Sequence, residues 1–430
     1  MRVLTVVGNL DVRGTQRAAL SYTLAYQRAG HEVGVLAHSG GGPREQLLQR
    51  HSIPAFIGGV EPLLDSALRE AEAFRAEVVH IHRAGPFNQK ELRILRALRR
   101  NNIVIETNVF GRVDYSPDAH LVDAHLHISA FCLWRWHRWL GRRPQVGVLV
   151  PYPVESDNFK RVSDEERSRQ RAAWGIPDDA YVCGHVGFKL SKCVIDGFVA
   201  LTRKTSKAWL VCVPFTERLA EYVRLLPESV RARIVNVGQI SDDAELQRAY
   251  SAFDCLLHAA EIGESFGYVL AEAQLCGVPV VTLSRPHRDN AQVELVRHRV
   301  GGLVAGQSAC FGDAVVELYE DTALRTQIRS TAPARMHQLY DVERVTALAL
   351  RVIDTLKAHP DARARATALE LDPHLRTRVA DEVILGSLRD TVGGPSLSDL
   401  AMMRMLTHER SQQMVRMIRH REFPRLRISS

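Results

Sequence analysis

Short β-branched runs that alternate with amphipathic stretches constrain the fold of this chain most. In the first part of the sequence these runs occupy residues 3–7, 33–37, 78–82, 103–107 and 126–128. In the second part they recur at residues 181–186, 209–213, 233–237, 255–258 and 278–282. Helix-like segments lie between them, the clearest over residues 16–29 and 242–252. Strands separated by helices predict βαβ units, and therefore parallel sheets that are covered on both faces.

A proline-containing segment separates the two series of strands. Residues 150–154 (Val-Pro-Tyr-Pro-Val) and the charged run after them cannot continue a central strand. We therefore predict a first domain over residues 1–155, a second over 156–355 and a helical C-terminal extension over 356–430. Ligands of open α/β sheets bind beyond the carboxyl ends of the strands, so we expect the ligand in a cleft between the two doubly wound domains.

Composition excludes several classes of protein. The seven cysteines stand at irregular intervals without a Cys-x-x-Cys pair, which argues against a disulfide framework and a zinc site. The N-terminal apolar run is too short for a secretion signal, and no run approaches the ~20 residues of a membrane span. The net charge of +7 favours acidic partners, but the low aromatic content of 7% disfavours nucleic acid. We expect a cytoplasmic protein.

The C-terminal tail is basic. Residues 401–430 hold seven arginines interleaved with methionines, against two glutamates. One interpretation is a helix that lies on the inner face of the cell membrane and makes weak peripheral contact with acidic lipid. The other is a terminal helix that packs on the body of the protein with its arginines in water, and we favour this second interpretation.

The segment from His258 to Val281 carries the most specific chemical signal. It places two acids, Glu264 and Glu272, eight positions apart between two predicted strands. Residues 265–267 are expected to open a helix, whose N-terminal amides carry a partial positive charge that suits a diphosphate. Gly267 leaves out a side chain where a ligand would approach the backbone. A capping role for Glu264 and a solvated Glu272 are the alternatives, but the apolar neighbours of Glu272 disfavour a solvent-facing position.

This frame, Glu-Ser-Phe-Gly followed by Glu-Ala and Cys-Gly-Val-Pro-Val-Val, resembles the retaining glycosyltransferases of the GT-B fold in group 1, or family GT4. The resemblance covers residues 1–350 approximately and implies an α/β fold of two Rossmann-like domains that face a cleft. It also implies transfer of a sugar from a UDP-, GDP- or similar nucleotide-sugar donor to an acceptor hydroxyl, with retention. The acceptor would be a glycan, a lipid-linked molecule or a small molecule. No cofactor or metal is implied, and the chain contains no Asp-x-Asp pair.

The resemblance also assigns roles to residues of the second domain. Glu264 would bind hydroxyls of the donor sugar and act as a catalytic residue, while Glu272 would bind the ribose. Phe266, Gly267 and Tyr268 would lie against the donor. The lysine of the family's phosphate clamp corresponds to Lys192, a second candidate catalytic residue. The clamp arginine is replaced, with Phe188 or His185 in its place, and Lys189 is a candidate to supply the missing charge. Solvated positions remain the alternative for both lysines.

Fewer residues carry over in the first domain and beyond the central motif. Gly14 belongs to a loop that resembles the family's glycine loop, with Arg13 in place of one glycine. Asn108, the third candidate catalytic residue, stands where many relatives carry a cleft histidine, and an amide can hold a hydroxyl but cannot transfer a proton. His82 at a predicted strand end and Glu294 are candidate cleft residues, and a core position is equally compatible with His82.

These departures leave other functions open. A catalytically silent nucleotide-sugar-binding subunit of a glycosyltransferase complex is the main alternative, because Phe188, Arg13 and Asn108 all depart from the family pattern. An epimerase-like or phosphorylase-like enzyme of the same architecture is a further one. Donor binding without transfer to any acceptor would indicate the silent subunit.

Overall fold

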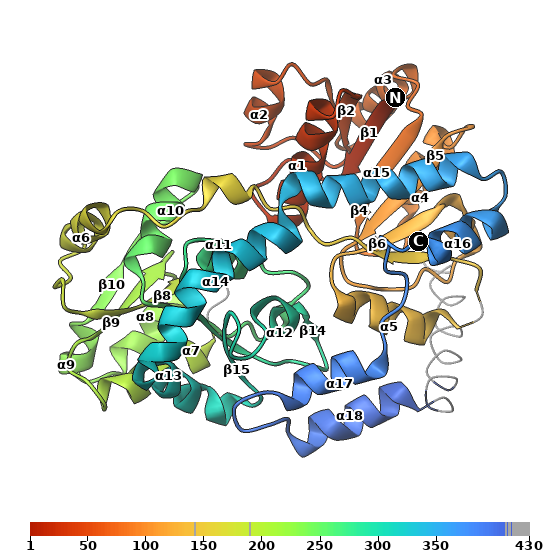
Figure 1. Cartoon of the computed structure of the whole chain (residues 1–430). Coiled ribbons are helices and arrows are strands. Elements are labelled where there is room, and N and C mark those ends of the chain that lie inside the picture. Colours follow the sequence, from red (N-terminus) through yellow and green to blue (C-terminus); the bar gives the residue numbers. More distant parts are fainter. Residues whose placement is uncertain (142, 189–190, 409–410, 412–413, 415–430) are drawn as a thin grey trace. The chain divides into compact units, whose positions relative to one another are not determined.

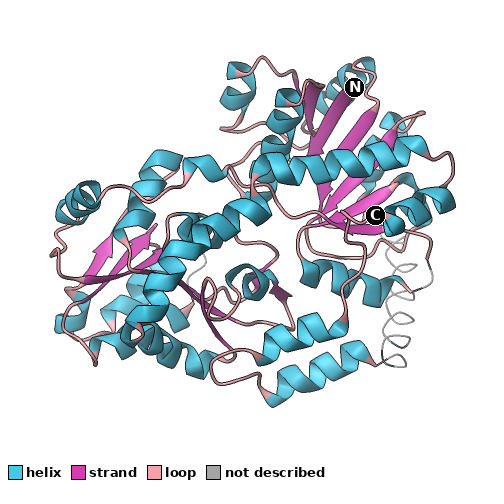
Figure 2. Cartoon of the chain, viewed as in Figure 1, coloured by secondary structure: helices cyan, strands magenta, loops and turns pink. Residues whose placement is uncertain are grey.

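The computed structural model describes residues 1–141, 143–188, 191–408, 411 and 414. Their contacts divide the chain into two compact units. Unit 1 comprises residues 1–154 and 342–381 with the described residues from Arg404 onward, and unit 2 comprises residues 155–341 and 382–403. Each unit holds a parallel sheet flanked by helices (Figure 1, Figure 2). The α/β class predicted from the alternating pattern is thereby confirmed.

Unit 1 is built on a sheet of seven strands, counted over the described residues, in the order β3-β2-β1-β4-β5-β6-β7. The strands are β1 (Arg2–Val7), β2 (Glu32–Ala37), β3 (Ala55–Ile57), β4 (Val78–Arg83), β5 (Ile103–Asn108), β6 (Ala124–His127) and β7 (Gly147–Leu149). All of their pairings are parallel, so their carboxyl ends lie at one edge. The five strands predicted here from sequence are confirmed to within about two residues. Strands β3 and β7 were not predicted, because runs of three residues show no periodicity.

Helices cover both faces of this sheet. They are α1 (Gly14–Arg28), α2 (Glu45–Arg50), α3 (Leu63–Ala73), α4 (Gln89–Leu98), α5 (Ala130–Leu140), α15 (Val342–Ala358) and α16 (Ala362–Leu371), with a 3-10 turn η1 (Pro117–Leu121). Successive side chains of a strand point to opposite faces. Val3 and Val7 therefore pack with α1 and α15, while Leu4 and Val6 pack with α3 and α4.

Unit 2 repeats the plan with a six-stranded parallel sheet, again counted over the described residues, in the order β10-β9-β8-β11-β13-β15. Its strands are β8 (Tyr181–Val186), β9 (Ala208–Val213), β10 (Ile234–Asn236), β11 (Cys255–His258), β13 (Val280–Leu283) and β15 (Gly302–Ala305). The short strands β12 (Gly263–Glu264) and β14 (Asp289–Asn290) pair separately. The five strands predicted for this part of the chain are confirmed.

The sheet of unit 2 also lies between helices. They are α6 (Asp164–Ala173), α7 (Lys192–Thr202), α8 (Glu217–Arg224), α9 (Glu228–Arg231), α10 (Asp243–Ala252), α11 (Tyr268–Leu275), α12 (Ala291–Val296), α13 (Phe311–Glu320), α14 (Thr322–Tyr340), α17 (Asp381–Arg389) and α18 (Leu397–Thr407), with 3-10 turns η2 (Ser156–Asn158) and η3 (Ser308–Cys310). One face packs against α7 and α13. On the other, the Phe253 ring fills the space that a Cβ at Gly184 would occupy, so a side chain there would displace it.

The unit boundaries differ from the domain limits expected from sequence. The first unit ends at Val154, but residues 342–381 return to it, whereas the expected second domain ran to residue 355. The physical reason is that Val345, Ala349 and Val352 of α15 complete the core on the first sheet. Residues 382–403 then join unit 2, where the backbone of Val392 bonds to the edge strand β15. The C-terminal segment is therefore divided between both units.

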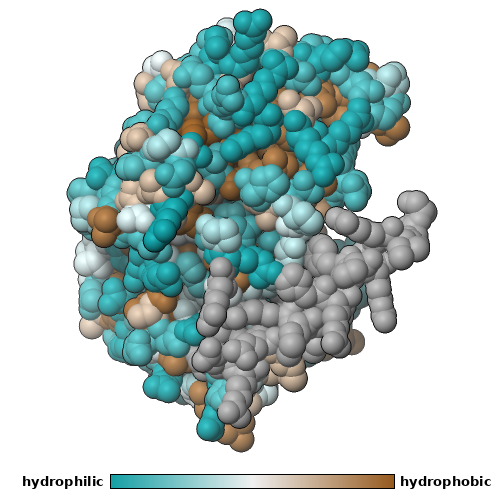
Figure 3. Space-filling model, turned by 90° about the vertical axis from the view of Figure 1, so that its right-hand side faces the viewer, coloured by the Kyte–Doolittle hydropathy of each residue, from teal (hydrophilic) through white to brown (hydrophobic). Residues whose placement is uncertain are grey.

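Surface hydropathy and helix length are the two features of the described residues that concern membrane contact. The face drawn in Figure 3 is mainly hydrophilic, with hydrophobic residues in scattered groups. Among the helices of the described residues, none is long and apolar enough to span a bilayer. Most of the basic tail over residues 401–430 lies outside the described residues.

Candidate functional site

The strand order of unit 2 locates its candidate site. From the middle of the sheet, β8, β9 and β10 follow one another toward one edge, and β11, β13 and β15 follow one another toward the opposite edge. In open α/β sheets the crevice at this reversal, beyond the carboxyl ends of the strands, is where ligands bind. Here the reversal lies between β8 and β11, and the chain leaves β11 at His258 toward Glu264.

The backbone around Glu264 is held firmly. Strands β12 and β14 pair Glu264 with Asn290, and the Glu264 amide donates to Gln292 Oε1 at 3.1 Å. Gly263 has φ +68°, and a Cβ at this position would lie 1.6 Å from the carbonyl oxygen of Asp289. No larger residue fits there without breaking the strand pair. The Glu264 side chain is 27% exposed, so its carboxylate stays within reach of a ligand.

A left-handed glycine turns the chain from Glu264 into helix α11. Gly267 has φ +101° immediately before Tyr268, the first residue of α11. The Ser265 hydroxyl donates to Asp289 Oδ2 at 2.7 Å, which ties this turn to β14. The predicted helix start is confirmed, and the left-handed backbone is a further reason for a glycine at this position. The amides at the start of α11 thus lie within a few residues of the partly exposed carboxylate of Glu264.

Glu272 lies in the interior. Its residue is 1% exposed, and its Oε2 accepts a hydrogen bond from the Tyr250 hydroxyl of α10 at 2.8 Å. The solvated alternative for this acid is therefore wrong. The apolar sequence around it had already indicated burial. To bind a ribose, this buried carboxylate would have to become accessible to the ligand.

The remaining predicted residues of unit 2 have distinct settings. Phe266 is 3% exposed and packs edge-on against Tyr268 and Tyr340, with ring centroids 5.3 and 5.4 Å away. Glu294 lies partly buried in α12, and its backbone carbonyl accepts from Arg335 Nη2 at 3.1 Å. Phe266 thus anchors the turn after Glu264 in the core, whereas Glu294 contacts helix α14 through its carbonyl.

Lys192 begins helix α7 at the carboxyl side of β8. Its ammonium lies 2.6 Å from Asp196 Oδ1, one helical turn further on, and this hydrogen bond raises the pKa of Lys192. Both side chains are more than half exposed, so the pair can open at little cost. Phe188, in the place of the family's arginine, is also exposed. The predicted donor residue Lys189 lies outside the described residues.

In unit 1, Asn108 is engaged by its own loop. The residue is 1% exposed, its Nδ2 donates to the Arg112 carbonyl at 2.7 Å, and its Oδ1 accepts from the Arg112 amide at 3.1 Å. These two hydrogen bonds close the loop after β5. Gly14 is exposed at the first position of α1, where the N-cap residue Arg13 makes no side-chain capping bond.

His82 is the candidate with unmet hydrogen-bonding capacity. It is 4% exposed near the end of β4, and neither ring nitrogen has a hydrogen-bond partner among the described residues. Its ring packs against Tyr22 and His80, with centroids 5.7 and 4.2 Å away. Burial lowers the pKa of His82 to about 3.

Stability in mild acid tests this buried neutral state. The folded pKa of His82 lies below its unfolded value, so the unfolded chain takes up the proton first and stability falls as the pH drops below 6.5. Between pH 7 and pH 5 we expect wild type to lose about 2 kcal/mol more unfolding free energy than His82→Leu, as measured by urea titration. Equal losses would show that His82 is protonated in the folded chain.

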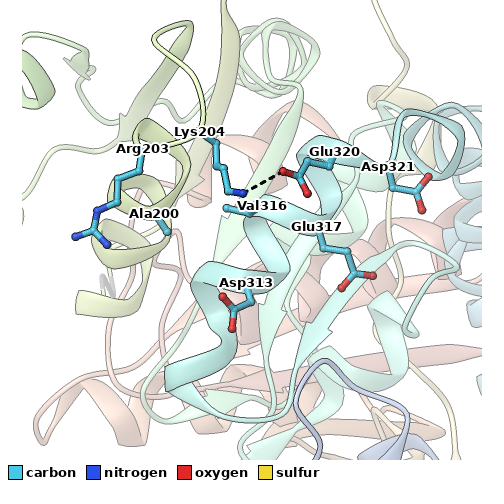
Figure 4. Close-up of a pocket in the computed structure, with 8 residues that line it drawn as sticks. All are labelled: Ala200, Arg203, Lys204, Asp313, Val316, Glu317, Glu320 and Asp321. Carbon is cyan, nitrogen blue, oxygen red and sulfur yellow. Dashed lines mark ion pairs between the residues drawn. The ribbon is translucent and has the colours of Figure 1, made fainter.

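A charged groove on unit 2 is a poor donor site. It has a volume of about 690 Å³ between α7 and α13 and is lined by four acids and two bases (Figure 4). Its lining residues are Ala200, Arg203, Lys204, Asp313, Val316, Glu317, Glu320 and Asp321. Lys204 is already paired with Glu320. The excess of acids would repel a diphosphate, and the described lining contains none of the predicted site residues.

The residues that hold Glu264 in place were not predicted from the sequence. His258, Asp289 and Gln292 contact Glu264 or the adjacent Ser265, yet they lie 6, 25 and 28 positions from Glu264 in the chain. Only the position of His258, at the end of a predicted strand, offered a signal for its role. The strand register that brings the other two into place cannot be obtained from local patterns.

Comparison with known proteins agrees with this arrangement. Residues 180–321 match the family model described as Glycosyl transferases group 1. The phosphatidyl-myo-inositol mannosyltransferase of Mycobacterium leprae (strain TN) is 34% identical over 139 residues, which is 32% of this chain and 33% of the relative. The chain thus matches about a third of that relative's length.

Solved structures of similar fold cover more of the chain. HepE of Anabaena in complex with UDP has a TM-score of 0.66 at 20% identity, covering 83% of this chain and all of HepE. Sucrose-phosphate synthase of Thermosynechococcus elongatus has a TM-score of 0.62 at 18% identity, again covering 83% of this chain and all of the other. The fold is therefore GT-B, as expected. The residues that match the Glycosyl transferases group 1 model, 180–321, lie within unit 2 of this fold.

Proposed function

We propose that this chain is a retaining glycosyltransferase of family GT4 that transfers a sugar from a nucleotide-sugar donor to an acceptor hydroxyl. The observation that carries the proposal is the position of Glu264: its partly exposed carboxylate is held at the strand-order reversal of unit 2, beside the start of α11. This geometry lies within the segment that matches the group 1 family. Because HepE was solved with UDP and with UDP-glucose, a UDP-sugar is the first donor to test.

The proposed chemistry needs stabilisation of a leaving diphosphate. Amides at the start of α11 and the ammonium of Lys192 would take the negative charge that develops as the anomeric bond breaks. Each well-placed donor of this kind contributes about 3–4 kcal/mol to lowering the barrier. These groups can serve in place of a metal ion, and we propose that no metal is required. Glu264 would hold hydroxyls of the donor sugar, and Glu272 would turn from Tyr250 to bind the ribose.

A thermal-shift panel tests the donor class. The full chain is melted with UDP-glucose, GDP-mannose, ADP-glucose and dTDP-glucose, first without metal and then with Mg²⁺. A ligand at 100 times its Kd adds about 2.7 kcal/mol of stability, which raises the melting temperature measurably. We expect a metal-independent shift with one nucleotide family. If no donor shifts the transition under either condition, the transferase proposal fails.

A catalytically silent nucleotide-sugar-binding subunit is the second candidate. It is favoured by Phe188 in the place of the clamp arginine and by Asn108, whose amide is already bonded to its own loop. Such a subunit would bind the donor in the panel above. It would release no nucleoside diphosphate with water or with any acceptor, which separates it from the enzyme.

The acceptor and the location remain proposals from the sequence. A glycan, a lipid-linked molecule or a small molecule would serve as acceptor, in the biosynthesis of a polysaccharide, glycolipid or glycosylated metabolite. We propose a cytoplasmic location, and we favour a basic C-terminal tail that packs on the body of the protein over one that makes weak peripheral contact with a membrane. Co-sedimentation of the full chain with anionic vesicles, and its absence with neutral ones, is the measurement that tests this contact.

A further inference from the structure

We infer that His258 and Thr282 form a relay that positions the carboxylate of Glu264 for the donor sugar, an inference that rests on the proposed function. His258 Nε2 lies 3.2 Å from Glu264 Oε1, and His258 Nδ1 lies 3.3 Å from Thr282 Oγ1. The imidazole therefore bridges a buried hydroxyl and a partly exposed carboxylate. Nothing in the family motif of two spaced glutamates requires a histidine at this place.

Strand register brings the relay together. His258 and Thr282 are direct partners in the parallel pairing of β11 and β13, so their side chains lie on the same face of the sheet. Thr282 is fully buried, and the His258 side chain is 7% exposed. Glu264 follows His258 by six residues. The β12–β14 pair holds it where its carboxylate contacts the His258 ring at the end of β11.

The chemistry of the three groups sets the direction of the hydrogen bonds. A carboxylate only accepts, so His258 Nε2 carries the hydrogen and donates to Glu264. In the neutral ring, Nδ1 is then an acceptor and receives the hydroxyl hydrogen of Thr282. Thr282 thereby selects the tautomer that can hold Glu264. In metal sites, a hydrogen bond at one ring nitrogen of a histidine likewise fixes the tautomer and orients the ring nitrogen that binds the metal.

Positioning matters because a free glutamate has several rotatable bonds. Ordering such a side chain on binding costs conformational entropy, and a hydrogen bond that orders it beforehand removes part of this cost. The backbone of Glu264 is already fixed by Gln292 and by the strand pair. The bond from His258 extends this order to the carboxylate itself.

The inference predicts a loss that depends on the sugar. Isothermal titration of the full chain with UDP-glucose and with UDP compares a donor that reaches Glu264 with a ligand that lacks the sugar. For His258→Ala we expect ~10-fold weaker binding of UDP-glucose, while the Kd for UDP changes by less than ~2-fold. Glu264→Ala should likewise weaken the binding of UDP-glucose but not that of UDP. GDP-mannose and GDP form the second pair of probes.

Conservative variants separate positioning from folding. Glutamine keeps an amide donor within reach of Glu264, so His258→Gln should bind UDP-glucose within ~3-fold of wild type. Thr282→Val keeps the volume but removes the hydroxyl, and it should weaken UDP-glucose by ~3-fold through the lost tautomer preference. The matched control is Thr5→Val in β1 of unit 1, where another buried threonine loses a 2.7 Å contact with the Thr23 hydroxyl. The control should leave both Kd values unchanged.

Several outcomes would overturn the relay. If His258→Ala weakens UDP and UDP-glucose equally, His258 supports only the local fold. If His258→Ala and Thr282→Val both keep the wild-type preference for UDP-glucose while Glu264→Ala loses it, Glu264 acts without the relay. Equal binding of UDP and UDP-glucose by wild type would also reject it, because the carboxylate then gains nothing from the sugar. A wild type that binds none of the four probes and no other donor of the thermal-shift panel overturns the proposed function instead.

Discussion

Replacing Glu264 with alanine is expected to lower kcat/KM for the nucleotide sugar by ~10- to 100-fold, the loss typical of a hydrogen bond to a charged group. The reason is that Glu264 offers a partly exposed carboxylate at the strand-order reversal of unit 2, and its backbone is fixed in this position. Release of UDP from UDP-glucose measures the effect. Glu320→Ala, which removes another exposed carboxylate of the same unit, should retain the wild-type rate.

The second glutamate of the motif should behave differently. Glu272→Ala removes the buried carboxylate that we propose binds the ribose, and it leaves the Tyr250 hydroxyl without this partner. Because UDP and UDP-glucose share the ribose, we expect both to bind more weakly. Turnover should suffer less than in Glu264→Ala once the donor is saturating. Wild-type rates and affinities in both variants would remove the two assignments together.

The largest loss of stability is expected from Asp254→Ala in unit 2. Asp254 Oδ2 lies 2.7 Å from Arg171 Nη2 and also accepts from the Val182 amide at 2.8 Å. The Arg171 side chain is 1% exposed, so removing Asp254 leaves a buried guanidinium without its counter-ion. Breaking such a pair costs about 3–5 kcal/mol. Urea unfolding of the full chain measures the loss.

An exposed pair provides the control for this substitution. Asp179 lies 2.8 Å from Lys207, with both side chains more than half exposed. Asp179→Ala should therefore leave the unfolding transition of the chain unchanged, because water replaces the lost contact. If Asp254→Ala were as stable as Asp179→Ala, the buried guanidinium would have found other compensation, such as the carbonyls of Ala180 and Ala252 that it already contacts.

Local patterns were sufficient for the strands and for the central motif. Runs of buried β-branched residues predicted ten of the strands, because a parallel strand covered on both faces leaves a continuous apolar signature. Gly267 was identified before a helix start as a position without a side chain, and the structure adds that its backbone is left-handed. The burial of Glu272 also followed from its apolar neighbours.

What the sequence by itself determined was thus the α/β class, most strands and the segment that carries Glu264, all of which depend on residues close together in the chain. Tertiary structure alone decided which residues support that segment. The partner of Glu272 is Tyr250, the partner of His258 is Thr282, and α15 returns to the first sheet. These contacts join residues 22, 24 or several hundred positions apart. They arise from strand register and core packing, which no local periodicity encodes.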